Sequence, residues 1–284
     1  MTSELSLASP WFYRAKAVHT RLRALGANLG SGTVSGGNGV RILFYHRIAD
    51  DADELAVSPQ RFERQMEYLA AKGYEALDVA GVWEKIVSGQ ASSRLVGLCF
   101  DDGYLDVADN GLPLLARHGF RATVFVATGV TSGTVAFSWY AKQPPLMAWD
   151  QIAELDAAGV LRFEPHTVTH PNLLRLGDAD ARVEIVESKR VIEERLGRGA
   201  RVFCYPAGLF GERERSYVEQ AGFELAVSCE PGVNVLETDP FALRRIQVDA
   251  RDGLAVFKAK VGGRFDTPSR LRASYRRRRH AGGS

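Results

Sequence analysis

The stretch LCFDDGYLD, residues 98–106, decides how the rest of this sequence is interpreted. An apolar run typical of a buried strand ends abruptly at two adjacent carboxylates, Asp101 and Asp102, which Gly103 follows. Aspartate and glycine are common in turns, so a turn accounts easily for one of the two aspartates. It accounts only weakly for the second. The remainder of the chain must therefore decide between a plain turn and a functional site.

Strand and helix patterns alternate outward from this stretch. Strands are predicted at 40–46, 94–100, 122–127 and 160–166, and within RVFCYPAG, FELAVS and LRRIQVD. Helices are predicted at 58–73, where Ser58 and Pro59 form the start, around LPLLARHG and WDQIAELDAAG, and over 178–196. Continuous apolar strands that alternate with helices indicate a parallel sheet covered on both faces. We therefore expect an α/β fold, a distorted seven-stranded (β/α) barrel with a single catalytic domain.

Four segments are predicted from composition and periodicity. Residues 1–25 contain an amphipathic helix, whose stripe is Trp11, Ala15, Val18, Leu22 and Leu25. Residues 26–39 are a Gly/Ser-rich linker. The folded domain covers 40–265, and 266–284 form a basic, disordered tail. The helix either packs on the domain, which we favour, or lies on a membrane surface.

The composition is that of a soluble globular protein, with 45% hydrophobic and 25% charged residues. The net charge of +2 hides a tail that carries seven arginines and one aspartate from residue 264 onward. The three cysteines have no close spacing, which argues against a disulfide framework and favours a reducing compartment. No apolar run is long enough for a membrane span or a secretory signal. We expect a cytoplasmic protein, with peripheral contact at the inner membrane surface through the helix and the basic tail, and no nucleic-acid partner.

A second polar cluster lies in PHTVTHPNL, where His166 and His170 are four residues apart. This spacing is common among metal ligands, but two ordinary loop histidines would look the same. The zincin metalloprotease signature needs a glutamate beside the first histidine. Thr167 occupies that place, so a zincin protease is excluded.

Taken together, the two clusters favour a metal site over a turn. Asp101, Asp102 and His166 all fall at the carboxyl ends of predicted strands, where α/β barrels gather functional groups. Two histidines and one aspartate leave an open coordination position, as in catalytic zinc sites. The other aspartate is then free to take a proton from water whose pKa the ion has lowered.

These residues carry a family resemblance. LCFDDGYLD resembles the T-F-D-D-G motif of the polysaccharide deacetylase family (carbohydrate esterase family four), with Cys99 in place of the threonine. HTVTHPNL is similar to its H-S/T-x-x-H motif, and FCYPAG to the F-x-Y-P-x-G variant of its third motif. YHRI, SPQRFERQMEYLAAKGY and FRATVFVATG give further support. The order and spacing of the motifs agree over residues 40–250.

The resemblance implies a metal-dependent hydrolase that removes N-acetyl groups from N-acetylhexosamine units of a polysaccharide or its lipid-linked precursor. Asp101 would be the general base, and the metal ligands would be Asp102, His166 and His170. Zinc is the expected ion, although cobalt, nickel and manganese also suit such ligands. Substrate and oxyanion contacts, including a backbone N–H near Ala207, would come from Tyr205, Pro206 and Ala207.

Two departures from the family pattern affect these assignments. The third-motif arginine that steadies the base aligns with Cys204, and Arg245 is a candidate substitute. The C-terminal Leu-x-His motif, which supplies the general acid, is absent, because only His280 follows His170. A circularly permuted branch of the family takes its acid from an early strand. His46 is therefore the candidate acid, with a structural histidine as the alternative.

Two other functions stay open at this point. Related members of the fold hydrolyse other non-peptide amides, such as cyclic ureides or imides. The absence of the third-motif arginine and of the C-terminal Leu-x-His histidine would also suit a catalytically silent glycan-binding protein. Retention of both aspartates and both histidines argues against silence, because a silent protein does not need a base.

Overall fold

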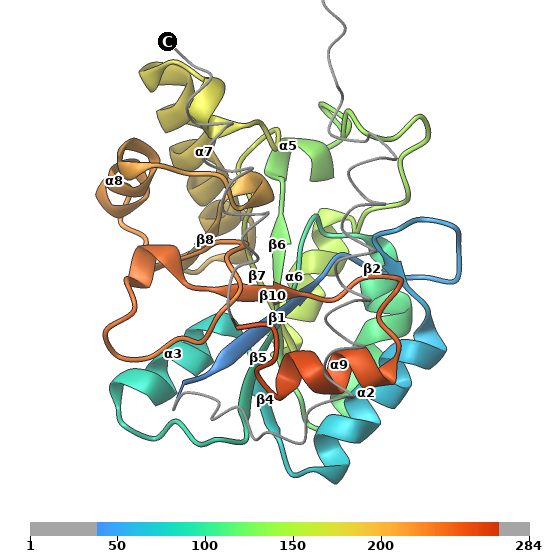
Figure 1. Ribbon diagram of the computed structural model, residues 1–284. Helices are drawn as coiled ribbons and strands as arrows, with labels where there is room; N and C mark the ends of the chain where they lie inside the picture. Colours follow the sequence, from blue (N-terminus) through green and yellow to red (C-terminus); the bar gives the residue numbers. More distant parts are fainter. Residues whose placement is uncertain (1–38, 267–284) are drawn as a thin grey trace, which may run out of the picture.

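The structure is a computed structural model that describes residues 39–266 (Figure 1). The predicted N-terminal helix, most of the linker and all but the first residue of the basic tail lie outside the described residues. None of the helices within 39–266 combines the length and the apolar character that a membrane crossing requires.

Six parallel strands form the main sheet, in the order β10-β1-β5-β6-β7, with β4 paired to β5. The bounds are β1 Arg41–Tyr45, β4 Glu75–Leu77, β5 Leu95–Phe100, β6 Ala122–Val126, β7 Leu161–Pro165 and β10 Arg245–Gln247. The central strand β5 pairs with β4 over its first half and with β6 from Cys99 onward. A short parallel pair, β2 Arg47–Ile48 and β3 Ala56–Val57, lies at the carboxyl end of β1.

The ring of strands is not closed by strand pairing. Strands β8 Val202–Cys204 and β9 Leu225–Val227 pair only with each other, and one bridge joins Val227 to Leu243 just before β10. Between β7 and β8 a side chain replaces the ladder, because Glu164 Oε2 accepts the N–H groups of Arg201 (2.8 Å) and Val202 (3.1 Å). The predicted parallel α/β fold is confirmed, and each of the seven predicted strands forms. In the described residues the strands of the expected distorted barrel form an open six-stranded sheet and the β8-β9 pair, with the small β2-β3 pair beside them, so strand pairing does not close the barrel.

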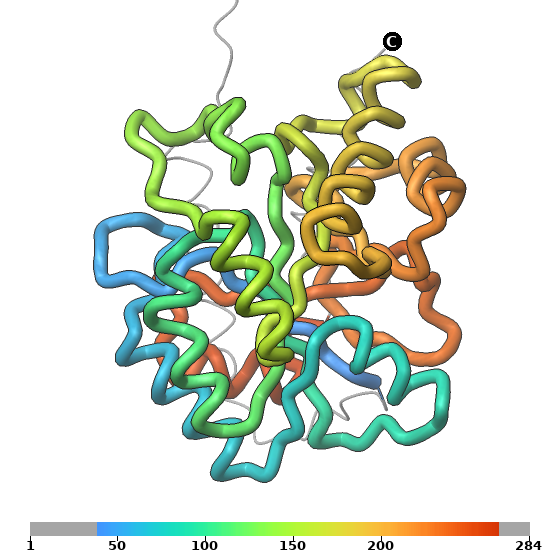
Figure 2. The backbone as a smooth tube through the Cα atoms, turned by 180° about the vertical axis from the view of Figure 1, so that it is seen from behind, coloured from blue at the N-terminus to red at the C-terminus, as the bar shows by residue number. Residues whose placement is uncertain are grey.

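Helices surround the strands on the outside (Figures 1 and 2). α3 packs against β4 and β5, while α6 and α7 pack against β7. The helix predicted from Ser58 and Pro59 begins at Pro59, buries Phe62 and Met66, and stops before Gly73, whose φ is +67°. The helices are α2 Pro59–Ala71, α3 Val79–Val87, α4 Leu112–Arg117, α5 Thr128–Thr131, α6 Trp149–Ala158, α7 Asp178–Leu196, α8 Glu212–Gln220 and α9 Leu254–Val261. Shorter turns are η1 Val107–Gly111, η2 Leu173–Arg175, η3 Pro206–Gly208 and η4 Pro240–Ala242.

Alternate residues of each strand belong to two different apolar layers. Leu43 and Tyr45 of β1 pack in the larger cluster, beneath the helices. Ile42 and Phe44 of the same strand belong to the inner cluster, which also contains Cys99, Phe125, Val202, Cys204 and Val227. This alternation is the period-two pattern of a strand that is buried on both sides. Because Arg245 is paired in register with Ile42, its side chain enters the inner layer.

Candidate metal and catalytic site

The end of β5 explains why two aspartates stand side by side. Asp101 continues the strand, since its N–H donates to Tyr45 O (3.0 Å), and its side chain therefore joins the inner layer. Asp102 turns away with φ at +74°, a conformation that L-residues seldom adopt. Gly103 also has a positive φ, and a Cβ there would lie 2.7 Å from Val126 Cγ1. The turn and the close packing thus direct the two carboxylates differently.

His166 and His170 come from the loop that follows β7. The His166 N–H donates to Val126 O (2.8 Å), which extends the pairing of β7 with β6 by one residue. The loop is then fastened to α7 by Glu184, whose carboxylate accepts the N–H groups of Val168 (2.8 Å) and Thr169 (2.9 Å). These bonds bring His170 back over His166, and the two Nε2 atoms lie 3.1 Å apart.

Backbone strain is concentrated at this end of the strands. Within residues 39–266, the non-glycine residues with positive φ are Asp102, Thr167, His170 and Ala207. All four lie in the three segments that the sequence singled out. Such conformations cost free energy and commonly mark functional sites. The strain is therefore an independent reason to place the site here.

Three buried or nearly buried groups form a set that fits a divalent cation. Asp102 Oδ1 lies 3.9 Å from His166 Nε2 and 3.7 Å from His170 Nε2. Tetrahedral zinc ligands stand about 3.4 Å apart, given bonds of roughly 2.0–2.1 Å. His166 Nδ1 donates to Cys204 O (2.7 Å), which leaves the Nε2 lone pair for a cation. Asp102 Oδ1 is buried and accepts no hydrogen bond from the described residues, a costly state that a cation would relieve.

The electrostatics of this set point the same way. Burial lowers the pKa of His166, and burial together with His166 lowers the pKa of His170 well below its usual value. Both imidazoles are therefore neutral, the form that binds metals. Burial, followed by the charge of Asp101, raises the pKa of Asp102 well above its usual range. A cation would reverse that penalty by favouring the Asp102 carboxylate.

Asp101 stands apart from this set because Arg245 holds it. The guanidinium donates from Nη1 to Oδ1 (2.6 Å) and from Nη2 to Oδ2 (3.0 Å), while its Nε donates to Ser228 O (2.9 Å). Arg245 is buried and lies over the Phe44 ring at 4.3 Å. Burial alone would raise the pKa of Asp101, but Arg245, together with smaller contributions from His166 and His46, more than offsets it and the pKa falls below its ordinary value. Asp101 is thus kept as a carboxylate that can accept a proton.

The other predicted residues occupy mixed positions. His46 follows β1, is half-buried, and lies close enough to Asp101 to contribute to lowering its pKa. The Tyr205 ring faces the outer layer, where it stacks on Phe210 and its hydroxyl donates to Phe241 O (3.2 Å). Pro206 is buried at the start of η3, and Ala207 is exposed with φ at +53°. Of Tyr205, Pro206 and Ala207, the backbone is therefore the part that is available to the site.

Sequence analysis missed a tyrosine relay behind Asp102. The Tyr104 hydroxyl lies 3.3 Å from Asp102 Oδ2 and 3.5 Å from the Tyr140 hydroxyl, which donates to Asp53 Oδ2 (2.5 Å). Arg47 completes the chain through its ion pair with Asp53 (3.1 Å). Tyr104 lies within the opening stretch and could have been noticed. Asp53 and Tyr140 come from loops without periodicity, and no sequence signal indicates that they meet.

The fold and site define a class: a parallel α/β protein with an Asp-Asp pair and two histidines at the carboxyl ends of its strands. The family model described as Polysaccharide deacetylase matches residues 88–226. YxkH of Bacillus subtilis (strain 168), which is named as an inferred polysaccharide deacetylase, is 27% identical over 221 residues, or 78% of this chain and 75% of YxkH. The poly-beta-1,6-N-acetyl-D-glucosamine N-deacetylase of Staphylococcus aureus (strain MRSA252) is 20% identical over 214 residues, 72% of each chain.

Solved structures show the same fold. IcaB from Ammonifex degensii superposes with a TM-score of 0.70 at 23% identity, covering 81% of this chain and 98% of IcaB. The deacetylase PplD of Streptococcus pyogenes superposes with a TM-score of 0.66 at 24% identity, covering 74% of this chain and 92% of PplD. The family-model match, which covers just under half of the chain, and these relatives agree with the resemblance to the polysaccharide deacetylase family that the motifs carry.

Proposed function

We propose that this protein is a metal-dependent carbohydrate de-N-acetylase. It would remove N-acetyl groups from N-acetylhexosamine units of a polysaccharide or of its lipid-linked precursor. The observation that carries this proposal is that the two adjacent aspartates have different partners. Asp101 is paired with Arg245, whereas Asp102 offers an unsatisfied oxygen to two neutral imidazoles. The family-model match and the poly-beta-1,6-N-acetyl-D-glucosamine N-deacetylase among the relatives support the choice of substrate.

Asp102, His166 and His170 would hold the cation, with zinc as the expected ion. When bound there, a divalent cation supplies Lewis-acid activation of water and of the acetyl carbonyl. The chain itself keeps both imidazoles neutral by burial and fixes the His166 ring through Cys204 O. Tyr104 supports the second oxygen of Asp102 from behind.

Asp101 would accept the proton of the attacking water as its oxygen bonds to the acetyl carbon. Arg245 would keep Asp101 ionised and hold its orientation through two parallel hydrogen bonds. This is the duty that the family assigns to its third-motif arginine. Cys204 stands at that place in the sequence and cannot perform it, while Arg245 reaches the same carboxylate from β10.

His46 would protonate the departing amine as the C–N bond breaks. Its place after the first strand of the sheet is the one expected for the circularly permuted branch of the family. The N–H of Ala207 would donate to the developing oxyanion, since its side chain contributes only a methyl group. His46→Ala should lower acetate release by about 10²-fold or more, as for other lost general acids. Full activity of that variant would remove His46 from the mechanism.

The proposal is tested by measuring acetate release from β-1,6-linked N-acetylglucosamine oligomers with the full chain reconstituted with zinc or cobalt. Asp101→Asn should lose about 10²- to 10⁴-fold in rate while keeping its metal content. Asp109→Asn, the same change at an exposed aspartate eight residues later, should leave the rate unchanged. No acetate from fully metal-loaded wild-type protein on any N-acetylated glycan would contradict the proposal. Ring opening of a cyclic imide, or glycan binding without turnover, would then identify the alternative functions.

A further inference from the structure

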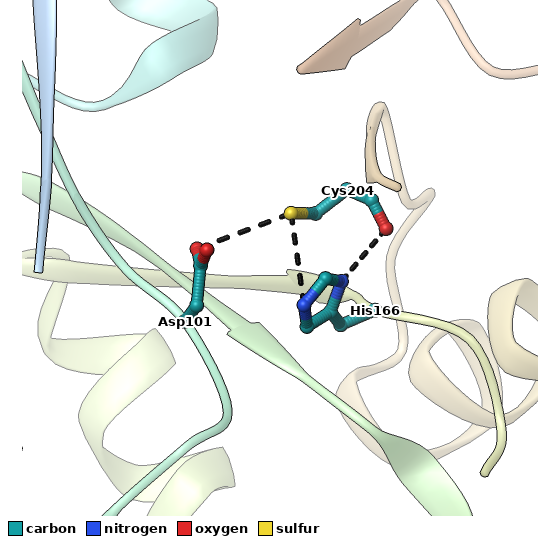
Figure 3. Close-up of side chains that lie close together, drawn as sticks. All are labelled: Asp101, His166 and Cys204. Carbon is teal, nitrogen blue, oxygen red and sulfur yellow. Dashed lines mark hydrogen bonds between the residues drawn. The ribbon is translucent and has the colours of Figure 1, made fainter. Parts of the chain in front are cut away.

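A thiol lies between the proposed base and a proposed metal ligand. Cys204, the last residue of β8, directs its sulfur into the inner layer (Figure 3). Its Sγ lies 3.9 Å from Asp101 Oδ1 and 3.9 Å from His166 Nε2. All three residues are buried, and together they form a second group of cation-ligand type beside the first. The two groups share His166.

The spacing of these three atoms suits a cation that prefers sulfur. In a tetrahedral zinc site, a sulfur and an imidazole nitrogen stand about 3.6 Å apart, given bonds of roughly 2.3 and 2.0–2.1 Å. The observed 3.9 Å exceeds this value by less than the Asp102 to His166 distance exceeds its own zinc value, so the spacing does not select the size of the ion. Thiolate ligands select soft cations, whereas carboxylates and imidazoles also accept harder ones. The sulfur ligand therefore favours a soft ion such as cadmium.

Arg245 acts on this group in two opposite ways. Its positive charge opposes a cation near Asp101, but its Nη2 also lies 3.2 Å from Cys204 Sγ and would donate to the thiolate. Because Cys204 is a buried free thiol, a cation must displace the S–H proton to bind through the sulfur. Only an ion with high affinity for sulfur is expected to do so. The hard ions manganese and magnesium would stay at the Asp102 group.

We propose that Asp101, His166 and Cys204 form a second cation position that is selective for thiophilic ions. A cation bound there would prevent a cation from binding at the group of Asp102, His166 and His170. The exclusion follows because His166 Nε2 has one lone pair and can ligate one ion at a time. Binding breaks the S–H bond of Cys204, forms a sulfur–metal bond and releases one proton to solvent, with no change in oxidation state. Occupation would also take Asp101 from its role as base. This inhibition rests on the proposed function, whereas the binding rests on the ligand geometry alone.

The binding is tested by titrating the metal-free full chain with cadmium chloride and recording the ultraviolet thiolate-to-cadmium charge-transfer band. Wild-type protein should develop the band to saturation near one equivalent. Cys204→Ser should lose it, while Cys229→Ser, a change at a neighbouring sulfur 3.7 Å from Arg245 Nη2, should keep it. Asp101→Asn should require at least about tenfold more cadmium. No band in the wild type, a band retained in Cys204→Ser, or one lost in Cys229→Ser would overturn the assignment.

The regulatory part is tested by adding cadmium to cobalt-loaded enzyme during acetate release, with each variant normalised to its own uninhibited rate. Cys204→Ser should be at least about tenfold less sensitive than wild type. Equal sensitivity would overturn the inhibitory role. Thermal unfolding checks that Cys204→Ser is folded, and if it is not, the charge-transfer titration of Asp101→Asn decides the cation position alone. A wild type that binds cadmium as predicted but releases no acetate would refute the proposed function and leave the cation position standing.

Discussion

Two buried carboxylates, Glu164 near the end of β7 and Asp101 just after β5, are used differently. Glu164 of β7 accepts two backbone N–H groups through Oε2, while its Oε1 faces Arg162 (3.4 Å) and Arg198 (3.3 Å). Asp101 is held by Arg245 alone among the side chains in ion-pair contact with it. Burial raises the pKa of Glu164, whereas for Asp101 the guanidinium, together with His166 and His46, outweighs burial and lowers the pKa.

The comparison distinguishes a carboxylate with a structural role, Glu164, from the proposed general base, Asp101. Glu164 accepts backbone hydrogen bonds across the gap between β7 and β8, so its side chain replaces the strand pairing that is missing there. Asp101 has a strained neighbour, Asp102, with an unsatisfied oxygen, and two neutral imidazoles nearby. Buried charge alone therefore does not mark the site. Buried charge beside unsatisfied atoms and positive φ does.

Replacing each carboxylate by its amide should show the largest difference between the two residues. Asp101→Asn should cost about 10²- to 10⁴-fold in acetate release. Glu164→Gln should instead lower the free energy of unfolding by about 3–5 kcal/mol, because it breaks a buried charged network. Its rate per folded molecule should stay near that of wild type. Urea unfolding and acetate release on both variants measure this, and the reverse pattern would invalidate the distinction.

Arg245 provides the next largest effect, since it acts through Asp101. Arg245→Gln should destabilise the fold by about 3–5 kcal/mol, because it leaves the Asp101 charge buried and unpaired. With the guanidinium gone, burial should raise the pKa of Asp101. The acid limb of the pH–rate profile should then move to higher pH, since the base must be deprotonated. Arg245→Lys should restore part of the rate, and an unmoved acid limb in Arg245→Gln would show a purely structural role.

Glu184 should have a smaller effect, because it holds the His170 loop without reaching the cation group. Glu184→Gln weakens the hydrogen bonds to Val168 and Thr169. Cobalt affinity should fall by about 10- to 100-fold, as when outer supports of metal ligands are changed. Glu187→Gln, at an exposed position of the same helix, is the control. Equal cobalt affinities in the two variants would show that the loop orders itself without α7.

The smallest effect is expected at the membrane. Contact with the inner membrane surface is a prediction from the N-terminal helix and the basic tail. In co-sedimentation with anionic phospholipid vesicles, the full chain should partition more strongly than a chain reduced to 39–265, and added salt should weaken it. Equal partitioning would end this idea.

Much of the fold was predictable because apolar strands carry a strong local signal. The strands around residues 94–100, 122–127 and 160–166 formed where expected, and their parallel order brings Asp102, His166 and His170 to one edge. The open join at β8 was not predictable, because it depends on the Glu164 side chain reaching two distant N–H groups. Arg245 could be named only as a candidate, since its meeting with Asp101 depends on the register of β10 against β1.

The most direct test of the central claim is the position of the ion in a crystal of cobalt-loaded protein, located by anomalous scattering. We predict one strong peak within bonding distance of Asp102, His166 and His170, with Asp101 still paired to Arg245 and unbound. A fully loaded crystal with the peak on Asp101, or with no peak among these four side chains, would contradict the account.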